Sequence, residues 1–352
     1  MAFSKLSMSA AQVDAFLQSE GFGLISWGEV MGPSEENALA FAVQTGLLNI
    51  TDPVICDSPG CGQEKYLTYR ADRDSAKDAQ WCCRSSTGTP RCRNRKSALS
   101  NTWFDGSKLP ISTIMKLTLS WFFEVPVTSA AGQCQVAKSV AIDWYNQCRQ
   151  ICFSVIMDED ICIGGEGLTV EIDETHVWVH KNRRGRILRN QDVTVFGGIC
   201  RESKEAFAEF VPNVSGATLW PIIRRRIAEG TIIMSDEARV YDNLHRPDRG
   251  GYEHYQVTHK YHFVHPNDRN IHTNSIERQW GLIKKSIKGF SKDDYHGPLY
   301  LGEYEYRRRH LKASTDRERR FRGDHFKIFL QHIVDIFPGP GRQSKIKLQP
   351  EF

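Results

Sequence analysis

The stretch LTVEIDETHVWVH, residues 168–180, decides the fold of the largest domain that the sequence predicts. Leu168, Val170 and Ile172 alternate with polar residues, as in a β-strand that buries one face. Asp173 points away from these apolar side chains, because successive residues of a strand face opposite ways. The pattern therefore predicts a strand that carries an acidic residue on its second face.

The segments that follow predict a mixed α/β domain over residues 165–312. VTVFGGICR and AFAEFVPN have the composition of two further strands, ATLWPIIRRRIAEG that of a helix and TIIMSD that of a short buried strand. We then expect a helix over EARVYDNLH, a strand over YEHYQVTH and a helix over HTNSIERQWGLIKKS (272–286). Elements in this order form a mixed sheet flanked by helices, the order of the ribonuclease H-like fold.

Three acidic residues of this domain are candidates for one catalytic site. Asp173 lies within the first strand, Asp236 ends the short buried strand, and Glu277 lies on the helix 272–286. Taken alone, Asp236 is better explained as a cap of the next helix. Together, three carboxylates can hold two divalent cations that stabilise the attacking and leaving oxygens of a phosphodiester displacement.

The helix 272–286 has one apolar and one polar side. Ile276, Trp280 and Ile283 recur at steps of three and four and predict a buried stripe. Glu277 and Lys284 are two turns apart, so they face the same way. The polar side is either a solvated face or one arm of an active site.

Three blocks resemble a known family: VEIDET (170–175), SDEARVY (235–241) and HTNSIERQWGLIK (272–284). They are similar to the signature blocks of Merlin-type DDE transposases and of the related bacterial insertion-sequence transposases, as are FGGICR and VTHKYHFVHP between them. The resemblance implies that Asp173, Asp236 and Glu277 bind two Mg2+ (or Mn2+) ions and that Lys284 lies beside the DNA end. Since some relatives use asparagine as the third ligand, Asn274 is an alternative to Glu277. If Glu277 is the third ligand, Asn274 and His272 are candidates to contact the metal ligands rather than the ions. Asn274 could instead simply cap the helix.

Residues 51–107, after a helical segment at 1–50, are poor in apolar residues and hold five of the ten cysteines. Such a segment needs an additional cross-link to be ordered. Because an intracellular chain keeps its thiols reduced, the cysteine cluster indicates a bound metal rather than disulfides. We expect a zinc-ribbon-like unit with structural Zn2+ on Cys56, Cys61, Cys83 and Cys92. Cys82 is the alternative to Cys83, and buried free thiols are expected elsewhere.

Residues 108–160 predict three helices, a short one in the middle, which fits a helix-turn-helix-like DNA-binding unit or a plain connecting bundle. TWFDGSKLPI (102–111) resembles, more loosely, the family's link between a zinc ribbon and such a unit. Residues 313–352 are expected to form a basic tail. Basic clusters occur at 224–226, 284–288, 307–309 and 316–322 and suit a phosphate-rich partner, with solvated helix faces as the alternative.

Lys plus Arg exceeds Asp plus Glu by only four, 46 against 42, so overall charge identifies no partner. No apolar run approaches the about 20 residues that span a bilayer. MAFSKLSMSAAQVDAF at 1–16 lacks the apolar core of a secretory signal. We therefore expect no membrane partner, and a protein of the nucleus in a eukaryotic host or otherwise of the cytoplasm.

These features predict a DNA transposase. The resemblance implies double-stranded DNA partners, namely terminal inverted repeats and target DNA, and a homo-oligomer of at least two subunits to pair two ends. Two alternatives stay open: a nuclease of the same fold without strand transfer, and a domesticated DNA-binding protein without catalysis.

Overall fold

The computed structural model describes residues 8–20, 22–23, 27–28, 34–50, 52–68, 79–84, 92–178, 193–246, 250–257, 272–287, 296–313, 315, 318 and 322–349. The chain divides into two compact units. One comprises Met1–Val155 with His310–Gln349, and the other comprises Ile156–Arg309 with Pro350–Phe352. No helix in the described ranges is long and apolar enough to cross a membrane.

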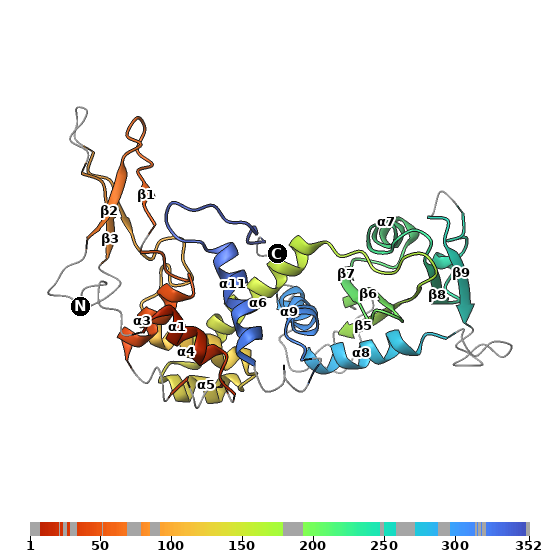
Figure 1. Cartoon of the computed structure of the whole chain (residues 1–352). Helices are drawn as coiled ribbons and strands as arrows, with labels where there is room; N and C mark the ends of the chain where they lie inside the picture. Colours follow the sequence, from red (N-terminus) through yellow and green to blue (C-terminus); the bar gives the residue numbers. More distant parts are fainter. Residues whose placement is uncertain are drawn as a thin grey trace, which may run out of the picture. The chain divides into compact units, whose positions relative to one another are not determined.

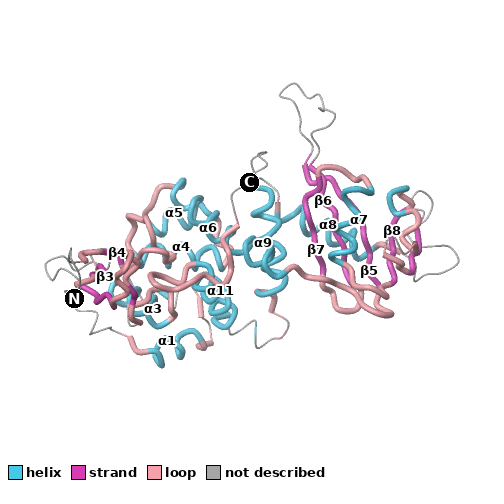
Figure 2. The backbone as a smooth tube through the Cα atoms, turned by 90° about the horizontal axis from the view of Figure 1, so that it is seen from above, coloured by secondary structure: helices cyan, strands magenta, loops and turns pink. Residues whose placement is uncertain are grey.

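The second unit is built on a five-stranded mixed sheet (Figures 1 and 2). Its strands are β5 (Thr169–Trp178), β6 (Val193–Cys200), β7 (Ala206–Val211), β8 (Ile232–Asp236) and β9 (Glu253–Val257). They lie in the order β7-β6-β5-β8-β9. The β7-β6-β5 pairs are antiparallel, whereas β8 runs parallel to β5 and β9 parallel to β8. The predicted mixed sheet is confirmed.

Helices cover both faces of this sheet. Figure 1 shows α7 (Gly216–Arg226) and α8 (Asn274–Ser286) on opposite sides of it. Val170 and Ile172 pack in a cluster with Leu219, Ile223 and Tyr241. Ile276, Trp280 and Ile283 pack on the other face with Val195 and with Leu301 of α9 (His296–His310).

This arrangement corrects one expectation and confirms another. β5 was predicted to bury one face, but its second face is also covered, because α8 packs on it and Glu171 is fully buried. The apolar stripe predicted for α8 is confirmed, since Ile276, Trp280 and Ile283 are all buried.

The helix expected over EARVYDNLH is wrong. This stretch contains only a short 3-10 turn, η2 (Arg239–Tyr241). Asn243 then adopts a positive φ of 63°, which ends any helix. The chain turns back so that Tyr252 N donates to Leu244 O at 3.1 Å. Burying both Tyr241 and Leu244 in the core therefore outweighs the local helical preference.

The first unit contains α1 (Ala10–Leu17), α3 (Glu35–Gln44), α4 (Ile111–Phe122), α5 (Val127–Cys134), α11 (Arg322–Ile336) and most of α6 (Lys138–Glu159). The three helices predicted over 108–160, with a short middle one, are therefore present as α4, α5 and α6. Trp121 packs on Phe329 at 4.5 Å between ring centroids, and Phe122 on Phe326 at 5.0 Å. Residues 313–352, expected as a basic tail, thus contain a helix whose apolar face belongs to the core.

The cysteine-rich segment forms a small antiparallel sheet. Its strands β1 (Val54–Ile55), β2 (Glu64–Thr68), β3 (Gln80–Cys82) and β4 (Arg95–Ser97) pair in chain order. Val54, Ala79, Trp81 and Ala98 make its small apolar cluster. So little buried apolar surface agrees with the expectation that this segment needs a further constraint.

Candidate functional site

Asp173 lies in the middle of β5 on the face that α8 covers. The indole Nε1 of Trp280 donates to its Oδ2 at 2.9 Å. Burial raises the pKa of Asp173 to about 7, and the nearby Glu174 and Asp236 carboxylates act in the same direction. Its ionised form is therefore short of countercharge at neutral pH, a condition that a bound cation would relieve.

Asp236 lies beside Asp173 at the end of the neighbouring strand. β5 and β8 are parallel with Glu171 paired to Met234. Asp173 and Asp236 each come two residues later, so they are neighbours on the same face. Asp236 Oδ1 also accepts a hydrogen bond of 3.0 Å from Ala238 N. Asp236 therefore supports a turn, in place of the predicted helix, and also lies beside Asp173.

Glu277 lies in the first turn of α8 and is exposed. The helix that carries it is attached to β5 through the Trp280 contact with Asp173. Among the described residues, the group of His, Cys, Asp or Glu donor atoms that lies within 4.8 Å is a cysteine cluster, so the three carboxylates are more widely spread. A site for two ions about 3.5–4 Å apart needs ligands distributed around both.

Gly197 makes room for this arrangement. It pairs with Asp173 across β5 and β6. A Cβ atom at Gly197 would lie 2.8 Å from the Trp280 ring and 2.6 Å from Phe207 O. The absence of a side chain therefore lets the indole approach the sheet and reach Asp173. Gly197 belongs to FGGICR, and the resemblance of that segment to the family assigns no role to this glycine.

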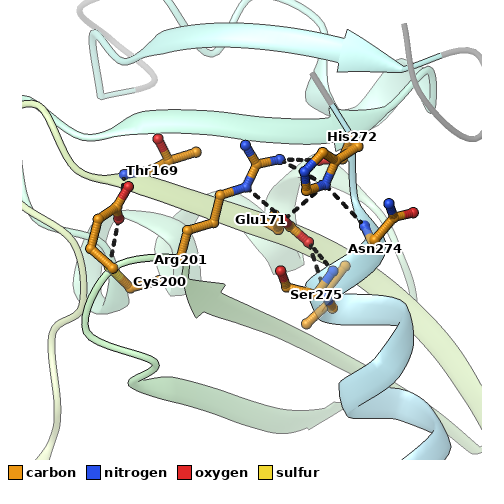
Figure 3. A network of polar contacts seen from close by, with 9 residues as sticks. Thr169, Glu171, Cys200, Arg201, His272, Asn274 and Ser275 are labelled. Atoms are coloured by element: carbon orange, nitrogen blue, oxygen red, sulfur yellow. Dashed lines mark hydrogen bonds and ion pairs between the residues drawn. The ribbon is translucent and has the colours of Figure 1, made fainter. Parts of the chain in front are cut away.

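Glu171 belongs to a buried polar network that the sequence did not single out (Figure 3). Its carboxylate accepts from Arg201 Nε at 2.6 Å and from the backbone N–H groups of Ser275 and Ile276 at 2.7 and 2.9 Å. His272 Nδ1 lies 3.4 Å from it. The sequence does contain a signal for Glu171. It is an acidic residue two positions before Asp173, on the same face of a strand that helices were expected to cover.

Glu174 forms a second polar pair that the sequence did not identify. It lies on the opposite face from Asp173 and accepts a hydrogen bond from the Tyr241 hydroxyl. Burial raises the pKa of both groups above their ordinary values. Tyr241 belongs to SDEARVY and Glu174 to VEIDET. Their hydrogen bond therefore connects two of the three blocks that resemble the family.

The remaining predicted residues of α8 lie in different settings. Lys284 is exposed near the end of the helix. Asn274 is exposed, and in Figure 3 it joins the network through its backbone N, which donates to His272 Nδ1 at 3.4 Å. Desolvation, followed by the Arg201 charge, lowers the pKa of His272. Its Nδ1 thus accepts a hydrogen bond at the start of α8.

Several arginines of the basic clusters are engaged within the protein. Arg226 is buried and pairs with Glu209 at 2.5 Å and with Asp160 at 2.9 Å. Arg307 pairs with Glu303 at 2.9 Å, and Arg309 with Glu159 at 2.6 Å. These ion pairs give Arg226, Arg307 and Arg309 a structural role, which was not among the roles expected for the clusters at 224–226 and 307–309.

Four cysteine sulfurs converge in the first unit, from Cys56, Cys61, Cys83 and Cys92, with all four within 4.8 Å of one another. The Cys56–Cys92 pair is 3.5 Å apart and the Cys61–Cys83 pair 3.6 Å. Disulfide sulfurs are about 2.05 Å apart, whereas tetrahedral Zn–S bonds of about 2.3 Å place sulfurs roughly 3.8 Å apart. The spacing therefore fits a zinc ion and not two disulfides.

Cys82 takes no part in this cluster. β3 ends at Cys82, and the sulfur of Cys82 lies 3.1 Å from Thr68 Oγ1 on the neighbouring strand.

A hydrogen bond with the Ser58 hydroxyl and one from Asn94 N lower the pKa of Cys92 to about 6. Asn94 in turn contacts Ser58 at 3.0 Å and the buried Lys65 amine at 2.8 Å. This network favours thiolate, the form in which cysteine binds metal.

Comparisons with known proteins agree on a family. Residues 164–309, which include Asp173, Asp236 and Glu277, match the ISXO2-like transposase domain. An uncharacterized transposase-like protein of Haemophilus influenzae is 33% identical over 104 residues, which are 29% of this chain and 80% of that protein. A simian T-cell lymphotropic virus intasome structure in complex with PP2A regulatory subunit B56 gamma has a TM-score of 0.29 at 13% identity, over 58% of this chain and 74% of that chain, too low to bear on the fold. The chain belongs to the ISXO2-like transposase family.

Proposed function

We propose that this chain is a DNA transposase that cleaves transposon ends and joins them to target DNA. The observation that carries the proposal is the placement of Asp173 beside Asp236, with the helix of Glu277 attached to Asp173 through Trp280. The strands around them form the mixed sheet that was expected for a ribonuclease H-like domain. We keep the narrower Merlin-type assignment as part of the proposal.

Asp173, Asp236 and Glu277 would hold two Mg2+ or Mn2+ ions. Oxygen ligands suit these hard cations, and a bound cation would offset the burial that raises the pKa of Asp173. When bound, the ions supply Lewis-acid stabilisation of the attacking and leaving oxygens. Glu277 is favoured over Asn274 as the third ligand, because an amide brings no charge against two dications. The exposed Lys284 would contact a phosphate of the DNA end.

The first unit would recognise the terminal repeats. Its cysteine cluster would hold structural zinc, and the helices α5 and α6 would form the helix-turn-helix-like reader. Pairing two ends requires at least a dimer. The proposal keeps the expected domains: a helical segment at 1–50, a zinc-ribbon-like unit at 51–107, a helix-turn-helix-like unit at 108–160 and the catalytic domain at 165–312. It also places the protein in the nucleus of a eukaryotic host, or otherwise in the cytoplasm.

A strand-transfer assay tests the proposal directly. Duplex oligonucleotides that carry the repeats flanking the coding sequence are incubated with the full chain and Mg2+ or Mn2+. We expect nicked ends and joined products from the wild type, and neither from Asp236→Ala, with end binding preserved. The exposed Asp242→Asn is the matched control and should keep both activities.

Each alternative predicts a different result in that assay. Cleavage without joined products would identify a nuclease that lacks strand transfer. Tight end binding without cleavage by the wild type would identify a DNA-binding protein that has lost catalysis. Full activity of Asp236→Ala would overturn the metal-ligand assignment.

A further inference from the structure

We propose that Glu171 is a positioning residue that holds the first turn of α8 against β5 and so sets where Glu277 stands relative to Asp173. Glu171 does not touch the reacting groups in this proposal; it acts through the helix. The role of Glu277 and Asp173 as metal ligands rests on the proposed function, whereas the placement of α8 by Glu171 can be tested without it.

The first argument is the hydrogen bonding at the start of α8. A helix leaves its first four N–H groups without partners in the helix. Thr273, which precedes α8, makes no side-chain cap. Instead the N–H groups of Ser275 and Ile276 both donate to Glu171 Oε2, at 2.7 and 2.9 Å. The cap of this helix thus comes from a strand about one hundred residues earlier.

The second argument is that α8 has two attachments to the same strand. Glu171 holds Ser275 and Ile276, and Asp173 accepts from Trp280. The strand anchors are two residues apart, about 6.6 Å along a strand. The helix anchors are four to five residues apart, about 6–7.5 Å along a helix. Because these lengths match, both contacts form together, and Glu277 lies in the turn between them.

The third argument is that Glu171 is held by a charged partner. Its side chain is fully buried, and Arg201 Nε donates to its Oε1 at 2.6 Å. The same guanidinium donates through Nη2 to His272 O at 2.5 Å. Arg201 therefore compensates the buried charge and also binds the residue that leads into α8 (Figure 3). A buried carboxylate with three donors has little freedom to move.

The Trp280 indole N–H reports the position of α8 by nuclear magnetic resonance. The chain has eight tryptophans, and Trp280→Phe assigns the resonance. In Glu171→Gln, an amide that both donates and accepts replaces a group that only accepts, so a donor must face Arg201 or the helix N–H groups. We expect the Trp280 resonance to shift in Glu171→Gln and Glu171→Ala while the other seven keep their positions.

Mn2+ titration adds a readout at the proposed metal site. In the wild type, Mn2+ should broaden the Trp280 resonance, because this indole contacts Asp173. Loss of a residue that orients metal ligands typically weakens metal affinity about 10–100-fold. We expect half-broadening in Glu171→Gln to need at least about tenfold more Mn2+.

Two controls separate positioning from general destabilisation. Glu35→Gln removes a cap of the same chemistry in the other unit, where Glu35 accepts from the N–H groups of Ile111 and Ser112 at 2.7 and 2.9 Å. Glu202→Gln removes a nearby carboxylate that bonds Thr169 N rather than α8. Both should leave the Trp280 resonance and its Mn2+ dependence unchanged.

The outcomes are distinguishable. An unchanged Trp280 resonance in folded Glu171→Gln overturns the positioning role. If Glu171→Ala loses all indole dispersion, it has failed to fold, and Glu171→Gln alone decides. If Mn2+ never broadens Trp280 in the wild type, the proposed metal site fails, while the shift of the metal-free resonance still decides the role of Glu171.

Discussion

The indole N–H of Trp280 donates to the Asp173 carboxylate at 2.9 Å across 107 residues of sequence. This contact joins the helix of Glu277 to the strand of the first candidate metal ligand. Gly197, which pairs with Asp173, provides the space in which the indole lies. The candidate site therefore depends on residues that are not themselves ligands.

Trp280→Phe should shift the pH dependence of metal binding upward. The indole hydrogen bond lowers the pKa of Asp173 against the effect of burial. Losing a hydrogen bond to a charged group costs about 1.5–3 kcal/mol, so the pKa of Asp173 should rise. A proton would then compete with the metal ion for this carboxylate up to a higher pH. We expect the pH midpoint of Mn2+ binding, followed by the Mn2+ paramagnetic signal, to rise by about one pH unit. Trp220→Phe, which loses a bond to Val240 O, is the control and should leave the midpoint in place.

Gly197→Ala and Gly281→Ala should change stability in opposite directions. A Cβ at Gly197 would collide with the Phe207 carbonyl and the Trp280 ring, so we expect a loss of about 1–3 kcal/mol in the free energy of unfolding. A Cβ at Gly281 would meet nothing within 4 Å. Because alanine favours helix, Gly281→Ala should gain about 0.5–1 kcal/mol. Urea unfolding measures both, and equal stabilities would contradict the packing described for Gly197.

Cys83→Ser should abolish zinc binding, whereas Cys82→Ser should preserve it. The sulfur of Cys83 lies in the four-cysteine cluster and that of Cys82 lies against Thr68. Serine offers no thiolate, so only the first change removes a ligand. Zinc content of the purified proteins, measured by elemental analysis, distinguishes the two. Zinc retention in Cys83→Ser would disprove the predicted ligand set.

Zinc removal should weaken binding of the chain to the transposon end, while the proposed metal site of Asp173, Asp236 and Glu277 remains intact. The sheet that carries the cluster has a small apolar core and depends on a further constraint. We expect end binding in a gel-shift assay to fall after chelation and to return when zinc is restored. Unchanged binding after verified metal loss would count against a recognition role for this unit.

Glu305→Gln should flatten the pH dependence of stability. Burial raises the pKa of Glu305 to about 7 from its ordinary 4.5, and among the described residues its Oε1 has no hydrogen-bond partner. The folded chain thus keeps a proton that the unfolded chain loses above pH 4.5. The stabilisation is complete below pH 4.5 and is lost as the pH rises through about 7, by up to about 3 kcal/mol.

Urea unfolding at pH 5 and pH 8 checks this expectation. The wild type should lose stability between the two values, and Glu305→Gln should lose less because its neutral amide does not titrate. The exposed Glu229→Gln should keep the wild-type difference. Parallel behaviour of wild type and Glu305→Gln would show that Glu305 is already ionised at pH 5.

Local pattern predicted much of the second unit. Period-two alternation located β5, and apolar steps of three and four located α8 with Ile276, Trp280 and Ile283 inward. The EARVYDNLH segment was mispredicted, because the burial of Tyr241 and Leu244 outweighs helix propensity. The basic composition of 313–352 likewise concealed α11, whose Phe326 and Phe329 pack into the first unit.

The sequence by itself determined β5, α8, the family resemblance and the candidate acidic residues, because periodicity and short blocks are local properties of a chain. Only the tertiary structure decided that Glu171 caps α8, that Gly197 admits Trp280, and that Cys83 rather than Cys82 joins the cluster. Each of these depends on which distant segments meet and on which side of a strand a side chain emerges. Such contacts are decided by the packing of the whole sheet and its helices, which no local pattern contains.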